Sequence, residues 1–121
     1  MAKRILIVDD SAFMRMALRD ILTTNDYEVV GEAENGQQAM VKFKEWLPDL
    51  VTMDVVMAGE TGLEVLRQIM DLDRNAKVLM VTAVSKQSMV VDALQAGAKG
   101  FLIKPFELNA VLAEIKRILK D

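Results

Sequence analysis

Several residues that can do chemistry follow short apolar runs of this 121-residue chain. Asp9 and Asp10 follow the first run, Asp54 the third, Thr82 the fourth and Lys104 the fifth. Three carboxylates close together repel one another unless a cation joins them. Ligands that are all oxygens select a hard ion, and Mg²⁺ suits a few carboxylates completed by waters and phosphate oxygens. Together, these five residues predict a phosphoryl-transfer site. In this site Asp54 attacks phosphorus and becomes an acyl phosphate.

Each of these polar residues taken alone has an ordinary structural interpretation. Asp10 could cap a helix, Thr82 could be a loop hydroxyl, and Lys104 could be a solvated charge. The functional hypothesis depends on finding complementary groups after four different runs, because the carboxyl ends of parallel strands share one edge of a sheet.

Composition excludes several kinds of chemistry and partner. The chain has no His and no Cys, which excludes a Ser-His-Asp triad, a thiolate nucleophile, disulfides and a zinc site of cysteine type. Fifteen Lys and Arg against eighteen Asp and Glu give a net charge of −3, and no basic block is present, so we expect no nucleic-acid binding. No run approaches the ~18 apolar residues that span a bilayer, and the N-terminus lacks a signal-peptide pattern. We expect a cytoplasmic protein that does not bind membranes.

The chain alternates short apolar runs with helical patterns, without a linker or repeat. Five runs rich in Val, Ile and Leu are predicted to be buried strands: Arg4–Val8, Glu28–Ala33, Leu50–Met53, Val78–Val81 and Gly100–Ile103. Between and after them, apolar residues recur with the period of five helices. The alternation favours a doubly wound α/β fold, a parallel sheet with helices on both faces, in one domain over residues 1–121. The alternative is a mixed α+β domain.

The helical period also indicates which residues are buried and where helices end. It places Leu47, Leu94 and Leu108 on the apolar faces of the second, fourth and fifth helices. Pro48 is expected to end the second helix, and Gly97 to cap the fourth.

At these residues the chain resembles the receiver domains of bacterial two-component response regulators, and most closely single-domain chemotaxis regulators of CheY type. The resemblance extends over essentially all 121 residues. The motifs that carry it are Ile7-Val8-Asp9-Asp10-Ser11, Phe13-Met14-Arg15, Asp49-Leu50-Val51-Thr52-Met53-Asp54, Val81-Thr82-Ala83, Ala96-Gly97-Ala98 and Lys104-Pro105-Phe106. It implies a flavodoxin/CheY-like (βα)5 fold with strand order 2-1-3-4-5.

The resemblance implies a phosphoacceptor and a metal site. Asp54 would accept the phosphoryl group. Asp9, Asp10 and Asp54, with the backbone carbonyl of Val56, would hold Mg²⁺, for which Mn²⁺ is a plausible substitute.

It further implies a switch. Lys104 would pair with the phosphoryl oxygens, and its peptide bond to Pro105 would be cis. Thr82 would move toward the phosphoryl group, with Phe101 as the aromatic partner of the switch.

The chain departs from the family in the loop after Asp54. Ala58 and Gly59 replace a Pro-containing pattern, so the loop should sample more backbone conformations, and Glu60 is either a solvated charge or a carboxylate that alters metal affinity. Val56 and Val84 stand where family members often carry polar residues that orient the hydrolytic water. Since neither can hydrogen-bond water, we expect slow self-dephosphorylation.

The resemblance suggests a monomeric phosphoacceptor that is not an enzyme acting on other molecules. Its phosphodonor would be a histidine kinase, and its output would be binding of a downstream protein, with the flagellar motor switch as the suggested partner. An excised receiver, and a degenerate receiver that acts only as a scaffold, are the alternatives within the family. A phosphatase of the haloacid-dehalogenase kind would need an acid at Val56, and a flavodoxin-like cofactor binder would need a phosphate-binding loop after the first strand.

Overall fold

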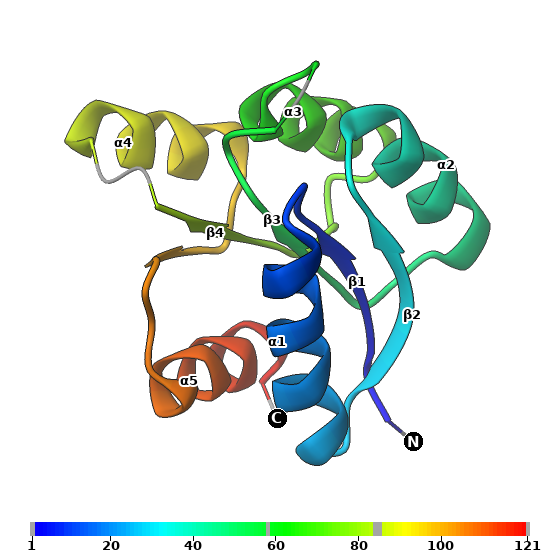
Figure 1. The fold of residues 1–121 in the computed structure, drawn as a ribbon. Coiled ribbons are helices and arrows are strands. Elements are labelled where there is room, and N and C mark those ends of the chain that lie inside the picture. Colours follow the sequence, from blue (N-terminus) through cyan, green and yellow to red (C-terminus); the bar gives the residue numbers. More distant parts are fainter. Residues whose placement is uncertain (1, 58, 84–85, 121) are drawn as a thin grey trace.

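The computed structural model describes residues 2–57, 59–83 and 86–120 of the chain. Its centre is a sheet of five parallel strands in the order β2-β1-β3-β4-β5 (Figure 1). The strands are β1 (Arg4–Val8), β2 (Glu28–Ala33), β3 (Leu50–Met53), β4 (Val78–Thr82) and β5 (Gly100–Ile103). The predicted strands, the parallel pairing and the strand order are confirmed, and β4 is one residue longer than expected.

Five helices alternate with the strands and cover both faces of the sheet (Figure 1). They are α1 (Ala12–Thr24), α2 (Gly36–Trp46), α3 (Gly62–Leu72), α4 (Gln87–Ala96) and α5 (Leu108–Leu119). Buried residues of α1 and α5 pack in one apolar cluster, and those of α2, α3 and α4 pack in the other. The sheet is therefore doubly wound, as the alternation predicts.

Local sequence signals mark the beginnings of two of the helices that follow the strands. Ser11 caps α1 by accepting a hydrogen bond from the amide of Met14, so the first residue of this helix, Ala12, comes three residues after Asp9. Thr61 and Glu64 form a capping box at the start of α3. The short connection from β1 to α1 keeps Asp9 and Asp10 close to the sheet edge.

Three predicted core leucines are exposed, and these predictions were wrong. Leu47, at 67% exposure, lies beyond the end of α2 in a left-handed conformation with φ 44°, so it leaves the helical face. Leu94 and Leu108 are about half exposed. The inward position of α4 belongs to Ala93, and Leu108 is the first residue of α5, ahead of the buried stripe that starts at Val111. As predicted, Gly97 caps α4, with φ 115°.

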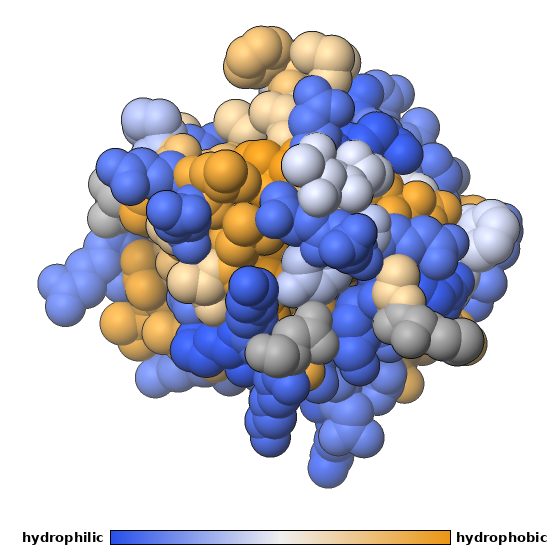
Figure 2. Space-filling view, turned by 90° about the horizontal axis from the view of Figure 1, so that it is seen from below, coloured by the Kyte–Doolittle hydropathy of each residue, from blue (hydrophilic) through white to orange (hydrophobic). Residues whose placement is uncertain are grey.

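The surface is mixed. Figure 2 views the molecule from below Figure 1, the end near α5 and both chain termini, and shows an apolar area bordered by hydrophilic residues. Within the described ranges, no helix is both long and apolar enough to cross a membrane.

Candidate functional site

Backbone hydrogen bonds continue past the strand ends and fix where the polar side chains start. The amide of Asp9 donates to the carbonyl of Ala33 at 3.0 Å, and the amide of Asp54 donates to the carbonyl of Val8 at 3.0 Å. The amide of Lys104 donates to the carbonyl of Thr82 at 2.8 Å. The residues after β1, β3 and β5 are thus held in place by the same ladder that holds the sheet.

The three predicted carboxylates lie together at this edge. Asp9, Asp10 and Asp54 each offer an oxygen, and these oxygens all lie within 4.8 Å of one another. Asp9 and Asp54 are buried, with 1% and 6% exposure, whereas Asp10 is exposed. The sequence prediction that these residues meet at one site is confirmed by the geometry.

Lys104 joins two of the carboxylates. Its Nζ lies 2.7 Å from Oδ2 of Asp9 and 3.2 Å from Oδ2 of Asp54, and its side chain is 14% exposed. The peptide bond between Lys104 and Pro105 is cis, as the resemblance implies. The ammonium group therefore belongs to the site, and its interpretation as a solvated charge is wrong.

Backbone amides orient the other oxygens of the two buried carboxylates. The amide of Ser11 donates to Oδ1 of Asp9 at 2.9 Å, and that of Val56 donates to Oδ1 of Asp54 at 3.1 Å. No hydrogen bond or ion pair to the Asp10 carboxylate is seen among the described residues. Asp10 is thus the carboxylate with oxygens available to a cation.

Burial and charge shift two pKa values at the site. Burial raises the pKa of the Asp9 carboxyl above its ordinary value and the nearby Asp54 charge adds to this, while hydrogen bonds from Lys104 and Ser11 partly offset it. Burial lowers the pKa of Lys104, but its hydrogen bonds and charge interactions with Asp9 and Asp54 outweigh burial and leave it above its ordinary value. The ammonium group is therefore charged, and it balances only part of the negative charge.

The donor set fits a hard divalent cation. The three carboxylates supply only oxygen ligands, and the ammonium group of Lys104 contacts two of them, those of Asp9 and Asp54. Mg²⁺ prefers few carboxylates together with waters and phosphate oxygens. Asp9, Asp10 and Asp54 can therefore serve as the protein ligands of such an ion.

The remaining predicted residues lie at or near the same edge. Thr82 is buried at the end of β4, beside the strand that leads to Lys104. Phe101 is partly buried in β5 and packs against the apolar cluster beneath α2, α3 and α4. Val56 is 55% exposed directly after Val55. Val84, for which a role in dephosphorylation is predicted, and Ala58 lie outside the described residues.

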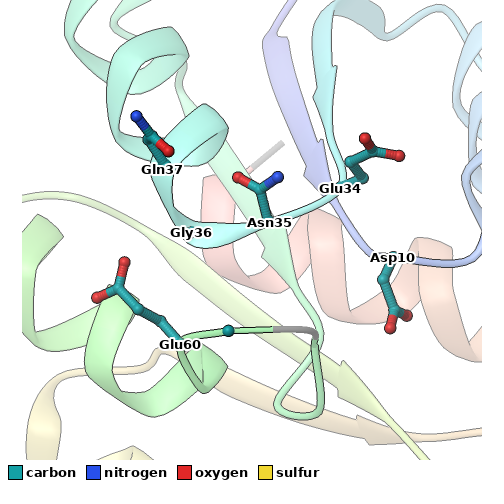
Figure 3. Close-up of a pocket in the computed structure, with 7 residues that line it drawn as sticks. Asp10, Glu34, Asn35, Gly36, Gln37 and Glu60 are labelled. Atoms are coloured by element: carbon teal, nitrogen blue, oxygen red, sulfur yellow. The ribbon is translucent and has the colours of Figure 1, made fainter.

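A groove that the sequence analysis did not foresee lies beside Asp10 (Figure 3). It has a volume of about 700 Å³. Its lining is Asp10, Glu34, Asn35, Gly36, Gln37, Gly59 and Glu60. The carboxylate of Glu60 is turned away from Asp10 in Figure 3 and accepts a hydrogen bond from Nε2 of Gln68 at 2.5 Å. Glu60 thus borders the groove without joining the carboxylate group.

Arg15, a motif residue to which the sequence analysis gave no role, contacts the site from α1. Nη1 of Arg15 donates to the backbone carbonyl of Asp9 at 2.7 Å, and its Nε lies 3.1 Å from Oε1 of Glu32. Arg19, one helical turn later, contacts Oε2 of the same Glu32 at 2.6 Å. Two arginines four residues apart were the available signal for a shared acidic partner.

Comparisons with known proteins agree with this geometry. The family model described as "Response regulator receiver domain" matches residues 5–116. The chain is 55% identical to the chemotaxis protein CheY of Bacillus subtilis, over 98% of this chain and 99% of the relative. It is 48% identical to CheY of Thermotoga maritima, over 99% of this chain and 100% of the relative.

A solved structure has the same fold. The crystal structure of the CheX–CheY–BeF3–Mg²⁺ complex from Borrelia burgdorferi superposes with a TM-score of 0.94 at 36% identity. The match covers 96% of this chain and 88% of the solved chain.

Proposed function

Since this chain belongs to the response regulator receiver family, we propose that it is a phosphoacceptor signalling protein of a two-component chemotaxis pathway, with Asp54 as the acceptor. We also propose that its residues form one receiver domain that catalyses only its own phosphorylation and dephosphorylation. The observation that carries the proposal is the position of Lys104, whose Nζ contacts the carboxylates of Asp9 and Asp54 at once.

In the proposed reaction, a carboxylate oxygen of Asp54 attacks phosphorus of a phosphohistidine on a histidine kinase. A P–O bond forms, the P–N bond breaks, and the electron pair leaves with the imidazole nitrogen, which takes a proton from solvent. The donor has to be another molecule because this chain contains no His. Lys104 is placed to pair with the phosphoryl oxygens, and the amide of Val56 orients the Asp54 carboxylate before attack.

We propose that Asp9, Asp10, Asp54 and the backbone carbonyl of Val56 hold Mg²⁺. When bound, this ion neutralises negative charge that builds up on the phosphoryl oxygens. The carboxylate oxygens within 4.8 Å of one another support the proposal, as does a solved CheY relative whose complex contains BeF3 and Mg²⁺. Mn²⁺ as a substitute stays a prediction from oxygen-donor chemistry.

The proposed output is a changed protein-binding surface. Thr82 would respond to the phosphoryl group and Phe101 would follow it, which links the site to α4, β5 and α5. Exposed apolar side chains on these three elements support a protein partner there: Val91, Leu94, Ile103 and Leu108. By similarity to the chemotaxis relatives we propose the flagellar motor switch as this partner, with the monomeric protein as the binding form.

The test is phosphorylation by a small donor. The protein is incubated with acetyl phosphate and Mg²⁺, and its intact mass is measured. We expect an increase of one phosphoryl group that is lost in Asp54→Asn and retained in the matched variant Asp73→Asn. Absence of any increase at every donor concentration would overturn the proposal and leave the scaffold function.

A further inference from the structure

Glu32, on β2, binds two arginines of the neighbouring helix α1. Its Oε1 lies 3.1 Å from Nε of Arg15 and its Oε2 lies 2.6 Å from Nε of Arg19. The backbone carbonyl of the same residue accepts a hydrogen bond from Nζ of Lys42 on α2. Glu32 therefore joins both helices that flank β2, with each carboxylate oxygen engaged by a different guanidinium group.

Arg15 extends this contact to the acidic site. Its Nη1 donates to the backbone carbonyl of Asp9 at 2.7 Å, while its Nε contacts Glu32. The Arg15 side chain is only 16% exposed, so the planar guanidinium group is confined between the two partners. One side chain thus connects β2 to the three-residue turn from Asp9 to Ser11.

Electrostatic repulsion between carboxylates acts on the turn from Asp9 to Ser11. It carries two of the three carboxylates, whose oxygens lie within 4.8 Å of that of Asp54, and like charges at this range repel. In the described part of the chain, the ion pairs of Lys104 are with Asp9 and Asp54 and not with Asp10. A tie to the Asp9 carbonyl opposes the repulsion without occupying a carboxylate oxygen.

We propose that Arg15 and Glu32 are positioning residues that hold the Asp9–Ser11 turn in the conformation that binds a divalent cation. The proposal rests on the metal site of the proposed function and adds the residues that determine its affinity. Arg15 contacts a backbone carbonyl and Glu32 contacts Arg15, so neither is itself a ligand.

The test is the affinity for Mg²⁺ alone, measured by isothermal titration calorimetry on the whole chain. Glu32→Gln should weaken binding about five-fold or more, because the neutral amide has one acceptor oxygen and cannot hold Arg15 and Arg19 together as the carboxylate does. Glu34→Gln is the matched control: it removes the same charge two residues later, beside the groove that Asp10 lines, and no ion pair of Glu34 is seen in the described residues. It should change the affinity less than two-fold.

A second variant separates geometry from charge. Arg15→Lys keeps the positive charge but loses the planar guanidinium group, whose Nε and Nη1 contact Glu32 and Asp9 at the same time. It should therefore weaken Mg²⁺ binding as Glu32→Gln does. If Arg15 and Glu32 act as a unit, the variant that carries both substitutions should have an affinity for Mg²⁺ no lower than that of the single variant with the lower affinity. Arg117→Lys, in an exposed pair on α5, should leave the affinity unchanged and serves as its control.

The outcomes distinguish this inference from the proposed function. Equal weakening by Glu32→Gln and Glu34→Gln, or unchanged binding in Arg15→Lys, would overturn the positioning role while the metal site stands. A parent protein that does not bind Mg²⁺ would overturn the metal site and the positioning role together. Urea unfolding of each variant without metal shows that the protein titrated is folded.

Discussion

Lys104 and Asp9 are separated by 95 residues in the chain, yet the Nζ of Lys104 lies 2.7 Å from Oδ2 of Asp9. The contact exists because β5 and β1 end at the same edge of the sheet, with β3 and β4 between them. The same Nζ also reaches Oδ2 of Asp54, after β3. One ammonium group therefore stabilises two buried carboxylates that come from different strands.

Removing this ammonium group should destabilise the metal-free protein. Lys104→Gln leaves Asp9 and Asp54 buried beside Asp10 without their cation, and we expect a loss of about 2 kcal/mol in the free energy of unfolding. Added Mg²⁺ should then stabilise the variant more than the parent, because the ion replaces the missing charge. Urea unfolding with and without Mg²⁺ measures both effects. The exposed Lys99→Gln is the control, and equal losses in the two variants would contradict the explanation.

The raised pKa of Asp9 predicts a pH dependence of stability. A carboxyl whose pKa is higher in the folded state binds its proton more tightly there, so its contribution to stability is present below the ordinary value of 3.8. That contribution is lost as the pH rises through the folded-state value. The measurement is made in EDTA, so that no metal is bound. The free energy of unfolding of the parent, relative to that of Asp9→Asn, should increase as the pH falls from above the folded-state pKa of Asp9 to below 3.8. The exposed Asp20→Asn should show no such trend, and a difference independent of pH for Asp9→Asn would refute the prediction.

Gly62 is required by close packing against the acceptor residue. A Cβ at this position would lie 1.9 Å from the backbone oxygen of Asp54, so Gly62→Ala must displace the chain there. We expect it to destabilise the protein by about 3 kcal/mol and to reduce phosphorylation of Asp54. Gly59→Ala is the matched variant. The φ of 85° at this position is strained for alanine, but no atom of the described residues beyond its chain neighbours lies within 4 Å of the added Cβ, so we expect the free energy of unfolding to fall by about 1 kcal/mol. Urea unfolding should rank the two variants in this order.

Val56 and Val84, which stand two positions after Asp54 and Thr82 in the sequence, predict a long-lived phosphorylated form. Val56, 55% exposed beside Asp54, cannot orient a water, and replacing it with Asn together with Val84→Glu should speed loss of the phosphoryl group about ten-fold or more. The decay is followed by intact mass after the donor is removed. Val41→Asn, on the exposed side of α2, is the control. An unchanged decay rate in the double variant would rule out the explanation.

The strands and the acidic site could be predicted from sequence because both depend on local pattern. The runs Arg4–Val8 and Gly100–Ile103 are short, apolar and rich in branched residues, and their predicted bounds match the structure. The parallel order then brings Asp9, Asp54 and Lys104 to one edge whatever the details of packing. The leucines at positions 47 and 94 were misplaced because a helix's end and its exact inward direction depend on its neighbours.

The sequence by itself determined the residue types of the site, the alternation that makes the sheet parallel, and the absence of any histidine that could donate a phosphoryl group. Only the tertiary structure decided which atoms meet. It assigned the Nζ of Lys104 to Asp9 and Asp54 together, and it placed Arg15 between Glu32 and the carbonyl of Asp9. Such contacts join residues on different elements, and their distances depend on how the helices pack against the sheet rather than on any local pattern.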